Sequence, residues 1–149
     1  MNRRILAVIA AVVALSASSL AEPAWACSCA GYATAEEHVS GTDVIFRGVV
    51  VRSERVRRWF GQRRSRPMMI TTFAVVRAYK GAVPTTVRVA HPEDICCVCG
   101  LTYRPGQEVV VFAHGAADRL STSACSRPRF DWPAYEAALA RTGEGTAGG

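Results

Sequence analysis

The residues best suited to chemistry in this sequence are six cysteines, which fall in three groups. Cys27 and Cys29 flank a serine near the N-terminus, three more lie between residues 96 and 99, and the last is Cys125. Cysteine sulfurs can bind soft metals, take part in redox reactions or form disulfides. An even number of cysteines in an exported chain favours disulfides over a metal site.

The first 26 residues indicate export, because they have the pattern of a secretory signal peptide. A short basic start precedes an apolar run over residues 5–20, and Ala24-Trp25-Ala26 places small residues at the positions that a signal peptidase reads. The apolar run is shorter than a membrane-spanning helix requires. We therefore expect a secreted protein that begins at Cys27. A lipoprotein signal, which would attach a lipid to Cys27 at the cell surface, is the alternative.

The chain that follows this leader has the length of one domain with a core. We assign residues 27–141 to that domain and residues 142–149 to a disordered Gly-rich tail. The leader carries two arginines and one glutamate, so its removal changes the formal net charge from +6 to +5. The mature protein is therefore expected to be moderately basic.

Five runs of β-branched and aromatic residues, separated by turn residues, predict five strands. They cover residues 43–52, 68–79, 85–90, 107–113 and 119–123. In the third run, Val87 and Val89 alternate onto one face. A predicted helix precedes the strands and another follows them. This order suggests an all-β domain, a small closed or partly open barrel, of which the five-stranded OB-fold is one solution.

The two predicted helices begin with recognisable capping signals. Residues 33–40 can form a short helix with Thr34 as N-cap and Glu37 at the capping-box position. Residues 131–141 can form a longer one, with Asp131 as the cap and a proline in the first turn. The residues expected on one face of this second helix are Tyr135, Ala138 and Leu139.

Five short motifs occur in order along the mature chain. They are Cys27-Ser28-Cys29, Asp43-Val-Ile-Phe-Arg47, Ala78-Tyr-Lys-Gly81, Val98-Cys99-Gly100 and Thr122-Ser-Ala-Cys-Ser126. In their order and spacing they resemble the tissue inhibitors of metalloproteinases, whose inhibitory domain is a netrin-like domain built on an OB-type barrel. The resemblance covers nearly all of the mature chain.

This resemblance implies a disulfide frame and an inhibitory function. The pairs it implies are Cys27–Cys99 and Cys29–Cys125. The free amine and the carbonyl of Cys27 would chelate the zinc of a target metalloprotease, and Ser28 would enter the pocket beside the metal. The protease-binding residues it implies are Cys27, Ser28, Cys29, Ala30 and Val98.

The second cysteine group admits further pairings. The pairing implied by the resemblance uses Cys99 and would leave a Cys96–Cys97 bond. A Cys96–Cys99 bond, with Cys97 joined to Cys27, is an alternative. A soft-metal or redox site is a third interpretation. Its additional ligands would be His91, Glu93 and Asp94.

An arginine-rich segment over residues 52–66 lies between the first two predicted strands, as a long hairpin loop. It is either a solvated hairpin tip or a site for an anionic partner, such as a surface polymer or a membrane surface. A nucleic acid is disfavoured as a partner, because a barrel fold alone does not indicate one. The residues that would contact such a partner are Arg55, Arg57, Arg58, Trp59, Arg63 and Arg64.

Sequence motifs of the common hydrolases and nucleotide-binding proteins do not occur in this chain. The three histidines are scattered, and Asp43 and Glu108 are better explained as a turn residue and a strand-end residue than as a catalytic pair. We therefore expect a protein that is not an enzyme and has no cofactor of its own. An extracellular binding or adhesion module that uses the arginine-rich loop is the alternative to an inhibitor.

Overall fold

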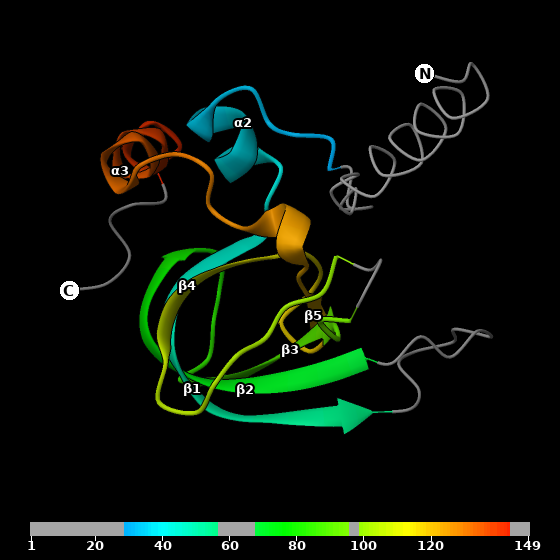
Figure 1. Ribbon diagram of the computed structural model, residues 1–149. Helices are drawn as coiled ribbons and strands as arrows, with labels where there is room; N and C mark the ends of the chain where they lie inside the picture. Colours follow the sequence, from blue (N-terminus) through cyan, green and yellow to red (C-terminus); the bar gives the residue numbers. More distant parts are fainter. Residues whose placement is uncertain (1–28, 57–67, 96–98, 144–149) are drawn as a thin grey trace, which may run out of the picture.

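The computed structural model describes residues 29–56, 68–95 and 99–143, and β-strands dominate it (Figure 1). The predicted signal peptide, Cys27, Ser28, most of the arginine-rich loop and residues 96–98 lie outside the described residues. The elements are α2 (Ala35–Ser40), β1 (Val44–Val56), β2 (Met68–Lys80), β3 (Thr86–Pro92), β4 (Glu108–Ala113), β5 (Leu120–Ser121), the 3-10 helix η2 (Ala124–Ser126) and α3 (Trp132–Arg141).

The five strands form one curved sheet in the order β4-β1-β2-β3-β5. All neighbouring pairs are antiparallel except β3 and β5, which run parallel. His114, just after β4, pairs with Ser121 of β5 through two backbone hydrogen bonds of 2.8 and 2.9 Å. This bridge links the two ends of the strand order, so the sheet is barrel-like, as the sequence predicted at this coarser level.

The first strand, β1, is long and irregular, and it has a different neighbour along each edge. β1 pairs with β2 from Ile45 to Val56 but with β4 only from Val44 to Val49. Register shifts interrupt its pairing with β2 at three places. Such irregularities increase the local twist and bend of a strand. The second half of β1 is mostly exposed and forms a hairpin with β2 that ends at Val56 and Met68.

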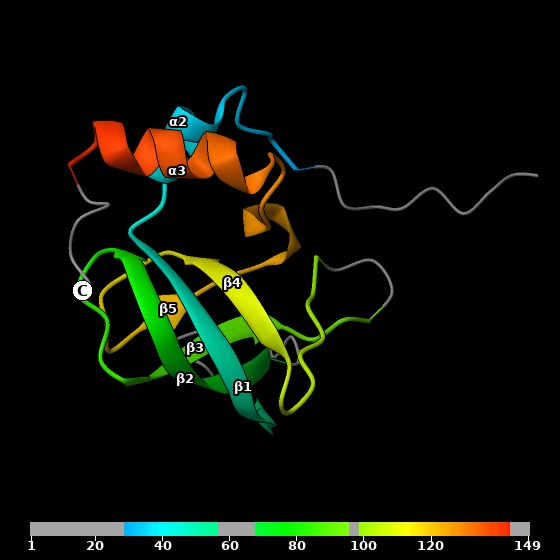
Figure 2. The same ribbon diagram turned by 90° about the vertical axis from the view of Figure 1, so that its left-hand side faces the viewer.

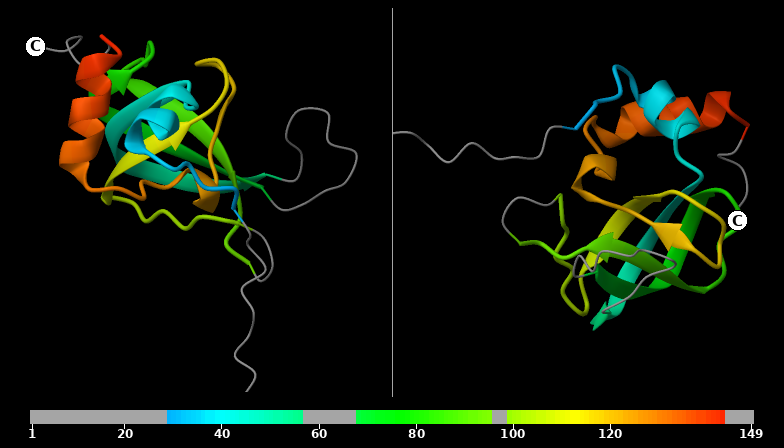
Figure 3. Two further views of the ribbon diagram at one scale, coloured as in Figure 1. Left: turned by 90° about the horizontal axis from the view of Figure 1, so that it is seen from above. Right: turned by 90° about the vertical axis from the view of Figure 1, so that its right-hand side faces the viewer.

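Two hydrophobic cores lie on opposite sides of β1 and β4. The barrel core contains Phe46, Phe73 and the alternating pair Val87 and Val89, which is buried as predicted. The second core lies between the sheet and the helices, where the rings of Phe112 and Tyr135 approach to 5.0 Å. The helices α2 and α3 lie side by side over one end of the barrel (Figures 2 and 3).

The helix ends match the capping signals only in part. Thr34 is the N-cap of α2, and its hydroxyl accepts a hydrogen bond from the Glu37 amide at 3.2 Å. The Glu37 carboxylate accepts from the Ala33 amide, one residue before the cap. Asp131 is the N-cap of α3 by position, but its side chain makes no capping hydrogen bond. Thr142, which the sequence placed in the tail, is the C-cap of α3.

The helices of the described region are short. None of them is both long enough and apolar enough to cross a membrane.

Candidate functional site

Three cysteines from distant parts of the sequence meet beside η2. Cys29 and Cys125 form a disulfide, with 5.4 Å between their Cα atoms. Cys99 is also disulfide-bonded, and its partner lies outside the described residues. The sulfur atoms of all three lie within 4.8 Å of one another. The start of the described chain is therefore held against η2 by the Cys29–Cys125 disulfide, and the sulfur of Cys99 lies close beside this bond.

The chain that leaves Cys29 runs along the surface before it enters α2. Ala30 and Gly31 are exposed, whereas Tyr32 is half-buried and stacks on the imidazole of His38 at 4.5 Å. The Ala33 amide donates to the Glu37 carboxylate at 2.9 Å. These contacts anchor the segment at both ends and leave its middle accessible.

The segment that carries Cys99 is fixed by backbone contacts on two sides. Its carbonyl accepts a hydrogen bond from the Ala124 amide at 3.0 Å, which ties it to η2. The Leu101 amide donates to the Pro92 carbonyl at 3.1 Å, which ties it to the end of β3. Gly100, between these two contacts, is buried. Cys99 and Gly100 thus lie where this segment is held between the backbones of η2 and the end of β3.

A buried histidine supports the N-terminal segment from below. Nδ1 of His38 and the Tyr135 hydroxyl share a hydrogen bond of 2.7 Å, and the Tyr135 oxygen also accepts a hydrogen bond from the Arg129 amide at 3.0 Å. The Nε2 atom of His38 is buried and has no hydrogen-bond partner in the described part of the chain. Burial lowers the pKa of His38, the charges of Arg129 and His114 lower it further, and the Ser126 backbone opposes them.

The other buried histidine, His91, lies in β3, and both of its ring nitrogens make hydrogen bonds. Nδ1 of His91 donates to the Pro92 carbonyl at 3.0 Å, so Nε2 accepts from the Thr71 hydroxyl at 2.8 Å. Ser53 in turn donates to the Thr71 oxygen at 2.7 Å. Burial lowers the pKa of His91, against the hydrogen bond to Pro92. Both ring nitrogens are used within the protein, which leaves neither to bind a metal with the cysteines.

The two buried histidines predict that the protein loses stability in mild acid. Because the pKa of His38 and of His91 is lowered by folding, the unfolded chain takes up protons first when the pH falls below about 6.5. Between pH 7 and pH 5.5 we expect the free energy of unfolding to decrease by up to about 1.4 kcal/mol per pH unit for each histidine. Above about pH 8 both histidines are neutral in the folded and the unfolded chain and contribute no slope.

Urea unfolding at several pH values measures this slope. His91→Gln removes one titrating group, so it should make the pH dependence shallower while lowering stability at pH 7.5. An unchanged slope in this variant would show that His91 does not carry the effect.

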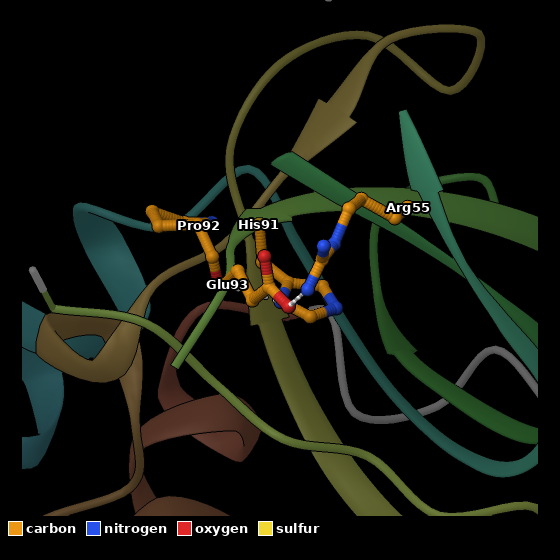
Figure 4. Close-up of polar contacts among 4 residues, drawn as sticks. All are labelled: Arg55, His91, Pro92 and Glu93. Atoms are coloured by element: carbon orange, nitrogen blue, oxygen red, sulfur yellow. Dashed lines mark hydrogen bonds and ion pairs between the residues drawn. The ribbon is translucent and has the colours of Figure 1, made fainter. Parts of the chain in front are cut away.

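The arginine-rich segment is only partly described. Arg55 lies in β1, and its guanidinium forms an ion pair with Glu93 next to the His91 ring (Figure 4). Arg52 pairs with Glu54 at 3.5 Å. Since exposed ion pairs of this kind contribute little to stability, their main effect is to offset positive charge at the base of the hairpin. Arg57, Arg58, Trp59, Arg63 and Arg64 lie outside the described residues.

Of the five predicted protease-binding residues, some are described by the structure and others lie outside the described residues. Cys29 and Ala30 are described, and Cys29 has the predicted partner Cys125. Cys27, Ser28 and Val98 lie outside the described residues. Sequence reasoning missed the His38–Tyr135 pair, which lies beneath the N-terminal segment.

Glu93 and Asp94 are the other ligands proposed for a soft-metal site, and the carboxylate of each contacts another side chain of the protein. Glu93 pairs with Arg55, and the Asp94 carboxylate accepts from the Thr102 hydroxyl at 3.2 Å. Among the described residues, the only potential metal-binding group is the trio of disulfide-bonded cysteines. Comparison of the sequence with models of known protein families, and with curated proteins, finds no match.

Proposed function

We propose that this chain is a secreted metalloprotease inhibitor of the type that its motifs resemble, the tissue inhibitors of metalloproteinases. One observation carries the proposal: the sulfurs of Cys29, Cys99 and Cys125 lie within 4.8 Å of one another. An inhibitor that acts through its N-terminus needs that end to be rigid. The Cys29–Cys125 bond fixes the chain two residues after the proposed first residue, and a bond between Cys99 and Cys27, as the resemblance implies, would fix the first residue itself.

We also propose that the barrel is a netrin-like OB-fold. The strand order β4-β1-β2-β3-β5, with its parallel β3–β5 pair and a bridge from the end of β4 to β5, supports this assignment. The helix α2 before β1 and the helix α3 after β5 agree with the order of elements that the resemblance implies. In this assignment Cys27 is the partner of Cys99, and Val98 lies beside the N-terminal segment.

The proposed chemistry uses backbone atoms. The α-amine and the carbonyl oxygen of Cys27 can form a five-membered chelate ring on a zinc ion that keeps an open coordination position. An α-amine has an ordinary pKa of about 7.7–8.0, so the neutral form that binds metal is accessible at neutral pH. Ser28 is small enough to approach the metal. A rigid N-terminus lowers the conformational entropy lost on binding.

Extension of the N-terminus tests this mechanism. Intact mass first establishes whether the purified protein begins at Cys27 with a free amine, because an acylated amine would indicate a lipid-anchored protein. The protein is then assayed against a panel of zinc metalloendopeptidases. One alanine added before Cys27 should weaken inhibition by about 100-fold or more, since it displaces the chelating atoms from the zinc.

A matched control is one alanine added after Gly149, which should leave inhibition unchanged. Equal inhibition by both extended proteins, with folding verified for each, would rule out chelation by the Cys27 backbone. Absence of inhibition by the unextended protein against every zinc peptidase tested would count against the inhibitor proposal as a whole.

A further inference from the structure

A groove opens on the surface where the two hydrophobic cores meet. Its volume is about 620 Å³, and it runs between β4 and the chain that leads from η2 into α3. None of its lining residues comes from the N-terminal segment over residues 29–34. The groove is therefore distinct in its residues from the proposed inhibitory site. Its volume falls within the range typical of small-molecule sites, about 300–1,000 Å³.

The apolar wall of the groove comes from both cores. Val109 and Tyr103 pack against the barrel core, whereas Val110, Phe130 and Trp132 pack against the core beneath the helices. All five side chains are only partly buried, so each retains surface that a ligand can cover. Such a wall of aliphatic and aromatic surface suits an apolar ligand body.

The charged groups of the groove are arginines. Arg47 of β1 and Arg127, just after η2, both line it, and no aspartate or glutamate is among its described lining residues. The side chain of Arg127 is exposed and makes no hydrogen bond or ion pair with the described residues. Arg47 pairs with Glu108 at 3.8 Å, but both side chains remain substantially exposed. Two guanidinium groups beside an apolar wall favour an anionic group on the ligand.

A tyrosine adds a neutral hydrogen-bond donor to this lining. Burial raises the pKa of Tyr103 to about 12, although the charge of Arg127 opposes this shift. The phenol therefore stays protonated at neutral pH and can donate a hydrogen bond. Its ring is held in place by edge contacts with Phe73 at 5.2 Å and His91 at 5.1 Å. The donor is thus fixed by packing before any ligand arrives.

We propose that this groove binds a small amphipathic anion, with its acidic head between Arg47 and Arg127 and its apolar body against Val110, Phe130 and Trp132. A carboxylate fits a guanidinium through two parallel hydrogen bonds. One ligand would then cover apolar side chains that pack against the barrel core and apolar side chains that pack against the core beneath the helices. This inference does not depend on the proposed inhibitory function.

Decanoate, a ten-carbon carboxylate, is a suitable probe for calorimetric titration of the purified protein below the concentration at which the probe aggregates. We expect one saturable site, and amide resonances of Val110, Phe130 and Trp132 should shift on binding. Arg127→Glu should weaken binding by about tenfold or more, since it replaces a charge-assisted hydrogen bond with like-charge repulsion. Arg127 is exposed, so the fold should tolerate the change.

Arg88→Glu is the matched control, because Arg88 is an exposed arginine on β3 that does not line the groove. It should change the affinity for decanoate by less than about twofold. The cation decyltrimethylammonium, with the same chain length, should not bind at this site.

Three results would overturn the proposal. Equal weakening by the two substitutions would indicate general attraction to a basic protein. Equal binding of decanoate and the cation would show that the arginines do not favour an anionic ligand. Failure of decanoate to bind, together with groove resonances that shift as the protein concentration rises, would identify the groove as a contact between two copies of the chain.

Discussion

Replacement of both Cys29 and Cys125 by serine is expected to lower the free energy of unfolding by about 4 kcal/mol. The two residues are separated by 96 positions, so their disulfide closes a loop that includes nearly the whole domain. A bond that closes so long a loop restricts the unfolded chain strongly, and the stabilisation grows with loop length in this account. Urea unfolding of the wild-type and double-substituted proteins, under non-reducing conditions, measures the difference.

Ser123→Ala is a local control for this experiment. The Ser123 hydroxyl accepts a hydrogen bond from the Cys125 amide at 3.3 Å and caps η2, so its loss disturbs the same turn without opening the disulfide. It should cost about 1 kcal/mol or less. If the double serine variant is as stable as Ser123→Ala, the disulfide does not contribute as proposed. A large loss of inhibition at unchanged stability would instead assign the bond a purely functional role.

Gly100→Ala is expected to destabilise the protein by about 2–3 kcal/mol, because the added methyl group would meet backbone atoms that cannot move aside. A Cβ at Gly100 would lie 2.5 Å from the Asp94 amide nitrogen, and the Glu93 carbonyl would be closer still. Leu101 is paired with Glu93 in a parallel bridge, so the two backbones are held together at this point. Relief of the clash would displace Cys99 and its hydrogen bond with Ala124.

Gly31→Ala provides the matched control, since it adds the same methyl group near the same disulfides. There the nearest atom is the Arg129 guanidinium at 2.6 Å, the far end of a flexible side chain that can turn away. We expect a change within about 0.5 kcal/mol. Thermal unfolding and the amide resonance of Ala124 distinguish the variants. Similar stability of both would show that the backbone contact at Gly100 is looser than the structure indicates.

The order of elements was predictable from the sequence because its signals are local. Alternating and β-branched runs identified five strands, and the capping signal at Thr34 identified the start of α2. Strand ends were predicted less well. β1 continues four residues beyond its predicted end at Arg52, because β2 provides a hairpin partner up to Val56. The predicted strand over residues 119–123 contains only the two-residue β5.

At the candidate site, too, the sequence identified the residues but not which of them come together in the fold. The sequence supplied the cysteines, and the resemblance to a known family selected the Cys29–Cys125 pair, which the structure contains. Even so, spacing alone could not choose among the possible pairings, because a disulfide depends on where the two backbones lie. The glycine of the motif Val98-Cys99-Gly100 was visible in the sequence, but the Glu93 backbone that explains it was not.

The sequence by itself thus determined the β-rich class, the number of strands and the identity of the residues with chemical potential. Their alternation and capping are properties of neighbouring residues and need no tertiary partner to be recognised. Tertiary structure alone decided that His38 and His91 are buried with lowered pKa values, and that the groove between the two cores is lined by Arg47 and Arg127. Burial, close backbone approach and charge around a cavity depend on residues far apart in the chain, which only the folded structure brings together.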